Sequence, residues 1–344
     1  MIKALITGGS GFFGNILIKH LLKEGWECIN FDIIPNNYID TNLINIKGDI
    51  RSKKDLFECF SQNKIDVVFH CAALLAHGKI DKQDLMNTNA AGTRNLAEIA
   101  SISGIKNFIY ISSNCLWGEG KSYPISEDDL PEPCDNYGKS KLEGELILKE
   151  FHQLNPKILR VPTLIDEGRL GLLGLLFDFI ADNKRCWVVG DGSNKYQFLY
   201  ARDLATACLS CYGRKNYEIF HLGSDNVRSL REVYQHVINN SNSKSKISKM
   251  PRRLTVLMMK IFYKLGLSPL GPYHWGMIAE SFQFDTTKAK NKLNWKPTLS
   301  NEEILLKAYK YYIRNRNEIL SRENVSAHNS VSKAGIIRLL KFIS

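Results

Sequence analysis

Tyr137 and Lys141 stand four residues apart in the segment 137–141, Tyr-Gly-Lys-Ser-Lys. In a helix, residues at this spacing lie on one face, so a phenol and an ammonium can point at the same ligand. A nearby positive charge stabilises a phenolate, which can then take a proton from an alcohol. The pair predicts proton transfer at a hydroxyl group. The alternative is a tyrosine packed inward beside a solvated lysine.

A glycine-rich turn near the N-terminus indicates a second function. Gly8, Gly11 and Gly14 lie between an apolar run and a helical pattern that begins with Phe12 and Phe13. A strand that turns sharply into a helix needs residues that tolerate positive φ, and the new helix N-terminus offers N–H groups to a pyrophosphate. The spacing is one residue looser than the usual G-x-G-x-x-G. The turn nevertheless predicts dinucleotide binding.

An acidic residue ends the second apolar run. Asp32 lies 18 positions after Gly14, about the distance at which dinucleotide-binding folds place the acid that binds a ribose. A carboxylate there accepts hydrogen bonds from both ribose hydroxyls and repels a 2′-phosphate. Because no arginine follows in residues 33–35, the sequence favours NAD over NADP. The alternative is an ordinary surface aspartate after a strand.

Two serines end another apolar run. Residues 107–112 are expected to form a strand that ends in Ser112, and Ser113 follows it directly. Ligands bind at the carboxyl edge of such parallel sheets, so a hydroxyl there can hold a substrate oxygen near Tyr137. Ser113 is the preferred candidate and Ser112 the second. The alternative is a serine that caps the following turn.

These motifs and several others give the chain a resemblance to a known family. Over residues 1 to about 315 it resembles the extended short-chain dehydrogenase/reductases of the NAD-dependent epimerase/dehydratase group. The segments that carry the resemblance are 7–14, 48–50, 70–73, 87–93, 112–113, 137–141, 159–160, 198–205 and 284–289. It implies that Ser113, Tyr137 and Lys141 are catalytic and that the last two also contact NAD. The further cofactor and active-site contacts that it implies are Asp49, Ile50, Ala72, Ala73 and Asn89.

The residues after the catalytic serine depart from part of that family. Dehydratases carry an acidic pair there, whereas this chain has Asn114 and Cys115, which argues against 4,6-dehydration. Some epimerases place a cysteine two residues after the serine, where its thiolate moves protons beside a transient ketone. Cys115 has that spacing, but no partner acid is identifiable. A packed apolar cysteine is the favoured interpretation.

The expected substrate contacts depart as well. Tyr196 stands where nucleotide-sugar enzymes usually have the arginine that holds the diphosphate, and Lys195 or Arg202 could substitute for it. Thr163 stands where asparagine is common. These changes weaken the case for an ordinary UDP-sugar without affecting the cofactor site. Residues 168–174 are expected to form a loop beside the site that could act as a lid.

The order of elements indicates an α/β fold, a Rossmann-type doubly wound parallel sheet with a smaller, discontinuous C-terminal substrate lobe. The expected strands are 2–7, 27–32, 43–47, 66–70, 107–112 and 157–161, and the expected helices 12–24, 52–61, 82–103 and 137–152. The NAD-binding domain would span 1–162 and 196–223, and the lobe 163–195 and 224–315. Residues 316–344 would form a basic tail with a terminal amphipathic segment.

The net charge of +11 is concentrated near the C-terminus. Residues 241–344 hold 19 Lys/Arg and 6 Asp/Glu, which leaves 27 and 29 for the rest of the chain. Segments 250–267 and 333–343 combine basic and apolar residues, a pattern that suits an anionic membrane surface. The alternative is a lobe helix packed on the core and a tail docked on the protein or on a dimer mate. No recognition motif accompanies the charge, so nucleic acid is not an expected partner.

Compartment, metal content and assembly follow from weaker signals. The chain begins with a strand pattern rather than a signal peptide, and it lacks an apolar run of 18 residues. We therefore expect a cytoplasmic protein. Any membrane contact is expected to be peripheral, at the inner face of the membrane. Cys208 and Cys211 form a lone CxxC pair, so no metal site is expected. By resemblance, helices 82–103 and 137–152 would pair with a second copy in a homodimer.

The combined hypothesis is an NAD-dependent epimerase of a sugar-nucleotide or related glycosyl substrate. Tyr137, helped by Lys141 and Ser113, would take a hydroxyl proton while hydride leaves the same carbon, and hydride would return to the opposite face of the ketone. One alternative is an NAD-dependent dehydrogenase of a lipid-like or sterol-like alcohol, similar to 3β-hydroxysteroid dehydrogenases. A non-catalytic NAD-binding protein is the other.

Overall fold

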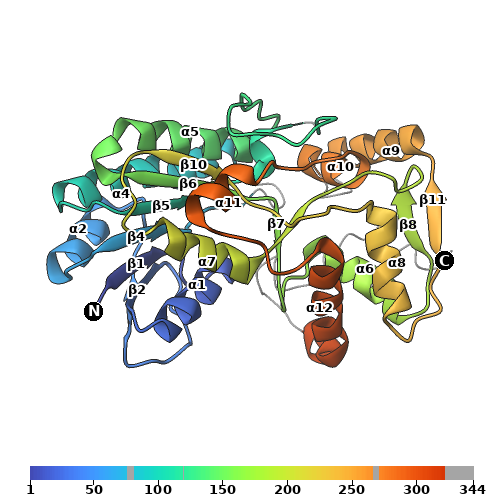
Figure 1. The fold of residues 1–344 in the computed structure, drawn as a ribbon, viewed down its shortest axis with the longest axis horizontal. Coiled ribbons are helices and arrows are strands. Elements are labelled where there is room, and N and C mark those ends of the chain that lie inside the picture. The colour runs from blue at the N-terminus through green and yellow to red at the C-terminus, as the bar shows by residue number, and fades with distance from the viewer. Residues whose placement is uncertain (76–80, 119, 266–270, 322–344) are drawn as a thin grey trace.

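A seven-stranded parallel sheet forms the centre of the N-terminal part of the molecule (Figure 1). The computed structural model describes residues 1–75, 81–118, 120–265 and 271–321. The strands, in sheet order, are β10 (Glu218–His221), β6 (Pro156–Arg160), β5 (Phe108–Ile111), β4 (Val67–His70), β1 (Lys3–Thr7), β2 (Glu27–Asp32) and β3 (Leu43–Lys47). The order reverses between β1 and β4, the switch point where ligands bind in such folds. The Rossmann-type sheet is therefore confirmed.

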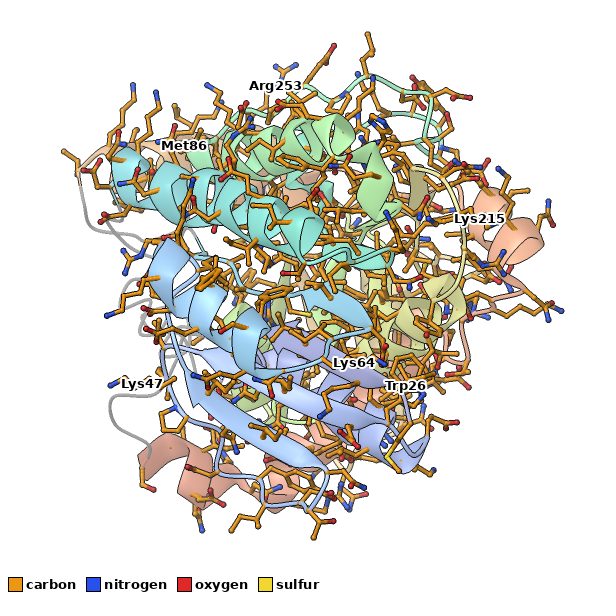
Figure 2. The ribbon with its side chains drawn as sticks, turned by 90° about the vertical axis from the view of Figure 1, so that its left-hand side faces the viewer. Trp26, Lys47, Lys64, Met86, Lys215 and Arg253 are labelled. Carbon is orange, nitrogen blue, oxygen red and sulfur yellow. The ribbon has the colours of Figure 1, made fainter. Side chains whose placement is uncertain are left out.

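Helices cover both faces of this sheet, which explains why its central strands are almost entirely apolar. The helices on one face are α2 (Lys53–Gln62), α4 (Gly92–Ile102) and α5 (Asn136–Glu150), and those on the other are α1 (Phe12–Lys23), α7 (Ala201–Cys211) and α11 (Thr287–Leu293). Trp26, labelled in Figure 2, packs beside Phe69 of β4 and the ring of Tyr212, which follows α7.

The helix expected over residues 82–103 is interrupted. It consists of α3 (Lys82–Leu85), a π-helical turn (Met86–Ala91) and α4. A π-helical turn accommodates an extra residue and is common at functional sites. The turn contains Asn89, one of the residues that the resemblance assigns to the active site.

A smaller lobe lies at the other end of the molecule, on the right in Figure 1. Its elements are β7 (Thr163–Ile165), α6 (Gly171–Ala181), β8 (Cys186–Val189), β9 (Phe198–Tyr200), α8 (Leu230–Asn239), β11 (Ile247–Met250), α9 (Arg252–Lys264), α10 (Pro272–Ala279), α12 (Asn301–Arg314) and α13 (Arg316–Ser321). Phe177, Tyr196 and Tyr312 are among the largest buried side chains of its core.

Some elements of the lobe differ from the expected arrangement. Within the stretch 196–223, β10 joins the large sheet beside β6, but β9 pairs with β7 in a separate two-stranded sheet. Of the expected tail, only α13 is described, and Arg316 binds Asp178 and Asp182 of α6 and the residue after it. Segment 333–343 lies outside the described residues. None of the helices in the described ranges combines the length and apolar character that a membrane crossing requires.

Candidate active site

The glycine turn between β1 and α1 is packed too tightly for side chains. Gly8 has a φ of +71°, and a Cβ there would lie 2.6 Å from the backbone of Ala72. A Cβ on Gly14 would lie 2.2 Å from the carbonyl oxygen of Gly8. Gly11 is the N-cap of α1, so the first backbone N–H groups of that helix, starting with those of Phe12 and Phe13, lie at the turn. The tight turn that these glycines allow, with the N-terminus of α1 beside it, forms a cradle that fits the pyrophosphate of a dinucleotide.

Asp32 lies beside this turn at the end of β2. Its carboxylate accepts hydrogen bonds from the backbone N–H of Ser10 and of Ile34, both at 3.0 Å. Each oxygen therefore keeps acceptor capacity for a further donor. The position and chemistry of Asp32 fit a ribose diol.

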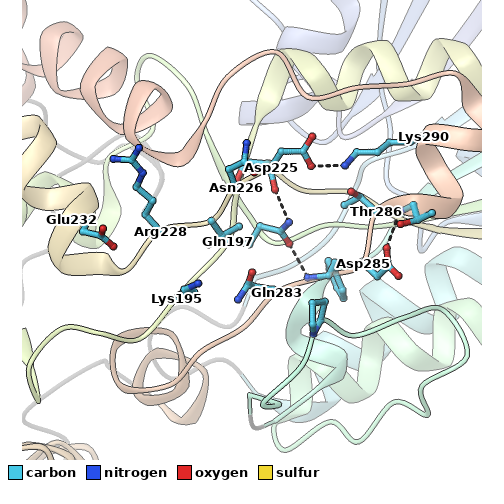
Figure 3. A pocket seen from close by; sticks show the side chains of 15 residues that line it. Lys195, Gln197, Asp225, Asn226, Arg228, Glu232, Gln283, Asp285, Thr286 and Lys290 are labelled. Carbon is cyan, nitrogen blue, oxygen red and sulfur yellow. Dashed lines mark hydrogen bonds and ion pairs between the residues drawn. The ribbon is translucent and has the colours of Figure 1, made fainter.

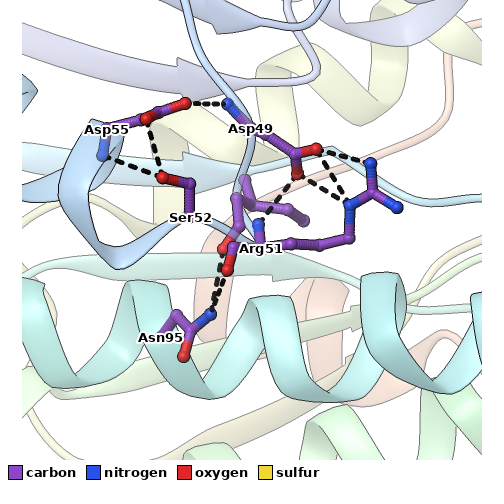
Figure 4. A network of polar contacts seen from close by, with 6 residues as sticks. Asp49, Arg51, Ser52, Asp55 and Asn95 are labelled. Atoms are coloured by element: carbon purple, nitrogen blue, oxygen red, sulfur yellow. Dashed lines mark hydrogen bonds and ion pairs between the residues drawn. The ribbon is translucent and has the colours of Figure 1, made fainter.

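Asp49 and Ile50 lie at the same edge of the sheet, because the N–H of Gly48 donates to the carbonyl of Asp32 at 3.0 Å. Figure 4 shows that Asp49 forms a bidentate ion pair with Arg51, with a shortest contact of 2.6 Å. The Arg51 guanidinium lowers the pKa of the Asp49 carboxyl below its ordinary value. An adenine in this place would share that carboxylate with Arg51.

Asn89 connects the segment after β4 to the helix that carries Tyr137. Its side chain exchanges two hydrogen bonds with the backbone of Leu74, directly after Ala72 and Ala73, at 2.7 and 2.9 Å. It also donates to the Ser140 hydroxyl at 2.9 Å, and that hydroxyl donates to the Tyr137 carbonyl at 2.8 Å. Asn89 thus holds the predicted cofactor segment and the predicted catalytic helix in register.

The buried histidine His70 supports the same region, and its role was not predicted from the sequence. His70 hydrogen-bonds Thr7 through Nδ1 at 2.7 Å and Thr93 through Nε2 at 2.9 Å. Burial lowers the pKa of His70 to about 3, so the imidazole is neutral. Thr93 donates to the carbonyl of Asn89 at 2.6 Å, which makes His70 a support for the π-helical turn rather than an acid or base.

Ser113 and Tyr137 come together at the carboxyl edge of β5. Ser113 caps a short turn by accepting from the Cys115 N–H at 3.1 Å, and Asp135 caps α5 by accepting from the Gly138 N–H at 2.7 Å. These caps fix the segments that carry the two residues, and the Ser113 hydroxyl is among the groups that lower the pKa of the Tyr137 phenol against the larger effect of burial. The two groups can therefore hold one substrate oxygen between them.

Lys141 lies one helical turn farther along, where it is 2% exposed. Its Nζ lies over the ring of Tyr110, 4.0 Å from the centroid. Burial lowers the pKa of Lys141 from its ordinary value of 10.5 to about 7, against the opposing attraction of the Glu145 carboxylate. Lys141 is thus a strongly desolvated ammonium group held against Tyr110 of β5.

The pKa of Tyr137 differs from the expectation. Burial raises it above its ordinary value, and the cation that acts against this effect is Arg169 rather than Lys141. Arg169 follows Gly168 in the loop expected to form a lid, and its guanidinium lies 5.3 Å from the ring centroid of Phe12. Arg169 was not among the site residues predicted from the sequence. Its only signal was a cation inside a glycine-rich loop beside the predicted site.

The two serines have different partners. Ser112 donates to the Glu145 carboxylate at 2.5 Å, and that carboxylate also binds Arg160 at 2.7 Å. Arg160 contacts the His221 ring at 3.4 Å. Since Ser112 is committed to this buried ion pair, Ser113 is the serine that remains beside Tyr137.

A small cavity, here called the catalytic cavity, lies between sequence neighbours of Ser113 and Tyr137, which do not line it themselves, and residues of the lobe. Its walls are formed by Asn114, Cys115, Trp117, Gly118, Gly120, Cys134, Asp135, Tyr196, Gly276, Met277, Glu280, Ser281 and Phe282. The Tyr196 hydroxyl accepts from the Asn114 amide at 2.8 Å and contacts the Thr163 hydroxyl at 3.3 Å. Tyr196 and Thr163 are therefore brought to the site, where they form a neutral polar cluster.

Lys195 and Arg202 are not brought to this cavity. Lys195 lines a larger cavity of about 770 Å³ on another part of the surface (Figure 3). Neither Ser113 nor Tyr137 is among the described residues that line it. Arg202 binds Asp166 at 3.0 Å and leaves about half of its side chain exposed. The placement of Lys195 follows from the alternation of side chains along an extended chain, because Tyr196 faces inward and its neighbour Lys195 faces the opposite way.

Cys115 lies in the wall of the catalytic cavity, but its chemistry does not favour proton transfer. Burial raises the pKa of its thiol, and the Asp135 carboxylate raises it further. We expect Cys115→Ser to keep turnover within about threefold of the wild type, whereas loss of a working acid–base group costs about 10²–10⁴-fold. Steady-state rates of Cys115→Ser and of the matched variant Cys134→Ser, from the same cavity wall, test this. A hundredfold loss confined to Cys115→Ser would restore the proton-shuttle role.

The buried Lys141 predicts a pH-dependent stability. With a folded-state pKa of about 7 and an ordinary value of 10.5, the folded chain binds fewer protons than the unfolded chain between these values. The cost of burying the charge is therefore largest at and below pH 7 and is relieved as pH rises toward 10. We expect Lys141→Met to raise the free energy of unfolding at pH 7 by about 1–3 kcal/mol. Urea unfolding at several pH values measures this, and a gain that does not shrink toward pH 10 contradicts it.

The comparisons with known proteins agree with this geometry. Residues 4–223 match the model of the NAD dependent epimerase/dehydratase family. The chain belongs to this family. It is 35% identical over 342 residues to the uncharacterized protein y4nG of Sinorhizobium fredii, covering 98% of this chain and 85% of the relative. It is 24% identical to the UDP-glucose 4-epimerase of Mycolicibacterium smegmatis, covering 92% and 100%.

Solved structures of this family share the fold. The UDP-glucose 4-epimerase of Thermotoga maritima with UDP-glucose superposes with a TM-score of 0.74 at 22% identity, covering 92% of this chain and 100% of that one. The Bordetella bronchiseptica enzyme WbmG in complex with NAD gives a TM-score of 0.75 at 21% identity, covering 91% and 94%. At these identities, the likeness shows that this chain has the same fold as the two solved structures.

Proposed function

We propose that the protein is an NAD-dependent epimerase of a glycosyl substrate. The observation that carries this proposal is the meeting of Ser113 and Tyr137 at the sheet edge, with Lys141 one turn away and the glycine cradle next to it. The cradle, Asp32 and the segment held by Asn89 fit NAD. Membership of the family and the UDP-glucose 4-epimerases among the relatives support the proposal.

The chain's own residues divide the reaction between them. When bound, NAD supplies a hydride acceptor and, once reduced, a hydride donor. Ser113 donates a hydrogen bond to the reacting oxygen while Tyr137 takes its proton, so that the carbinol becomes a ketone. Tyr137 then returns the proton after the ketone has presented its other face. Arg169 supplies positive charge that stabilises the phenolate.

The neutral cluster of Tyr196, Asn114 and Thr163 indicates which kind of substrate the cavity would accept, and it favours a second candidate function. Where relatives by resemblance would have an arginine for a diphosphate, this chain has a phenol bonded to an amide. That arrangement suits a less charged group in the cavity, as in net oxidation of a lipid-like or sterol-like alcohol by NAD.

One experiment separates the two candidates. The purified protein is incubated with nucleotide sugars and lipid-linked glycans that carry deuterium at the reacting carbon. Epimerisation predicts that the product keeps the label, that bound NAD is unchanged and that no NADH accumulates. Accumulation of NADH with loss of the label from the substrate contradicts the epimerase proposal and supports the dehydrogenase.

We also propose a homodimer in which α4 and α5 pair with their copies. Ile102 of α4 and Leu146 of α5 are 81% and 50% exposed, which supplies apolar surface on both helices. Light scattering of the wild type and of Leu146→Glu tests the proposal. A wild-type monomer contradicts it.

A further inference from the structure

Helix α9 exposes an apolar stripe to solvent. None of its 13 residues, all of which the structure describes, is buried. Leu254, Leu257, Met258 and Ile261, with Leu265 just after the helix, are 57%, 53%, 37%, 39% and 65% exposed. Their spacing of three, four, seven and eleven residues from Leu254 places them on one face. Figure 1 shows α9 beside α10 at the outer end of the lobe.

The stripe is not the face by which α9 packs on its own protein. The half-buried positions of the helix are Thr255, Val256, Met259 and Phe262, which lie on a different side. Tyr263 lies on this same side, between Val256 and Met259, and its ring centroid is 5.9 Å from that of Trp275 in α10. Five exposed large apolar side chains in one line therefore have no structural function within the described part of the chain.

The stripe is flanked by positive charge. Arg253, Lys260 and Lys264 are exposed and follow one another along the helix at spacings of seven and four residues, which puts them on one side of the stripe. Arg253 lies at the periphery of the molecule in Figure 2. Helix α9 contains no acidic residue, and the C-terminal part of the chain has the excess of Lys and Arg described above.

This positive charge indicates which partner binds the stripe. A second copy of α9 would bring equal charges together, and segment 333–343 of the same chain carries Lys333, Arg338 and Lys341 and no acid. An anionic bilayer complements both features, since apolar residues enter the boundary between headgroups and acyl chains while cations remain at the phosphates. We infer that α9 docks the protein on an anionic lipid surface through the stripe 254–265.

Vesicle flotation of the full-length protein tests this. We expect binding to phosphatidylcholine vesicles that contain about one third phosphatidylglycerol and no binding to phosphatidylcholine alone, with loss of binding at high salt. Leu257→Glu combined with Ile261→Glu is expected to abolish flotation. Arg253→Ala combined with Lys264→Ala is expected to weaken it about 25-fold, at about fivefold per charge.

Matched measurements keep the test independent of folding and of the proposed enzyme activity. Phe57 on α2 is also 60% exposed, and Phe57→Glu is expected to float like the wild type. All variants are checked for the NAD content and thermal stability of the wild type. Equal binding to both vesicle types, or unchanged flotation of the stripe variant, overturns the inference. So does a stripe variant that changes only the oligomeric state seen by light scattering.

Discussion

A Tyr137→Phe variant is expected to lower kcat by about 10³-fold, the usual contribution of a positioned acid–base group. The phenyl ring fills the same space beside Ser113 but has no proton to exchange with the substrate oxygen. Asp135 still caps α5 and Asn89 still holds the helix in register, so the fold and the cofactor cradle are unaffected. Turnover is measured on the substrate that the isotope experiment identifies, and NAD is quantified after heat release.

The matched control for this variant is Tyr123→Phe. Tyr123 is 52% exposed, and its hydroxyl donates to Asp129 outside the catalytic cavity, so full activity is expected. Wild-type turnover in Tyr137→Phe would refute the proposed chemistry. Loss of activity together with loss of NAD would instead assign Tyr137 to cofactor binding alone.

An Arg160→Met variant is expected to lower the free energy of unfolding by about 3–5 kcal/mol, because it leaves a buried carboxylate without its cation. Glu145 and Arg160 are 3% and 5% exposed, and they connect α5, which carries Tyr137, to β6. Removing both charges together, with Glu145→Leu and Arg160→Met, is expected to recover most of the loss. Urea unfolding at neutral pH measures all three proteins.

A second ion pair on the same helix provides the comparison. Arg94 binds Glu150 at the surface, at 2.8 Å, and Arg94→Met is expected to have no measurable effect, because solvent screens exposed pairs. A double variant as unstable as Arg160→Met would show that packing, rather than the unpaired charge, causes the loss.

The elements of the sheet could be predicted closely from the sequence because burial on both faces leaves uninterrupted apolar runs. Strands β2 and β3 occupy the expected ranges 27–32 and 43–47. The π-helical turn could not be predicted, since it depends on the bonds of Asn89 to residues distant in sequence. The pairing of β9 with β7 is also non-local, and the apolar run 198–200 fits either sheet equally well.

The candidate site was predictable where a motif has a local geometric cause. Gly8 and Gly14 are required by close backbone contacts, and the spacing of Tyr137 and Lys141 follows from the helix itself. The position of Arg169 depends on how the lobe folds over the glycine turn, which no local pattern encodes. The raised pKa of Tyr137 likewise reflects above all its burial by surrounding segments.

The catalytic cavity draws its wall from stretches of chain that leave the ribosome at different times. Asp135 precedes Met277, another residue of the wall, by 142 positions. N-terminal units fold first during synthesis, so a nascent chain can hold its cofactor long before it can grip a substrate. The wall of the catalytic cavity therefore cannot be complete before Phe282 has been made.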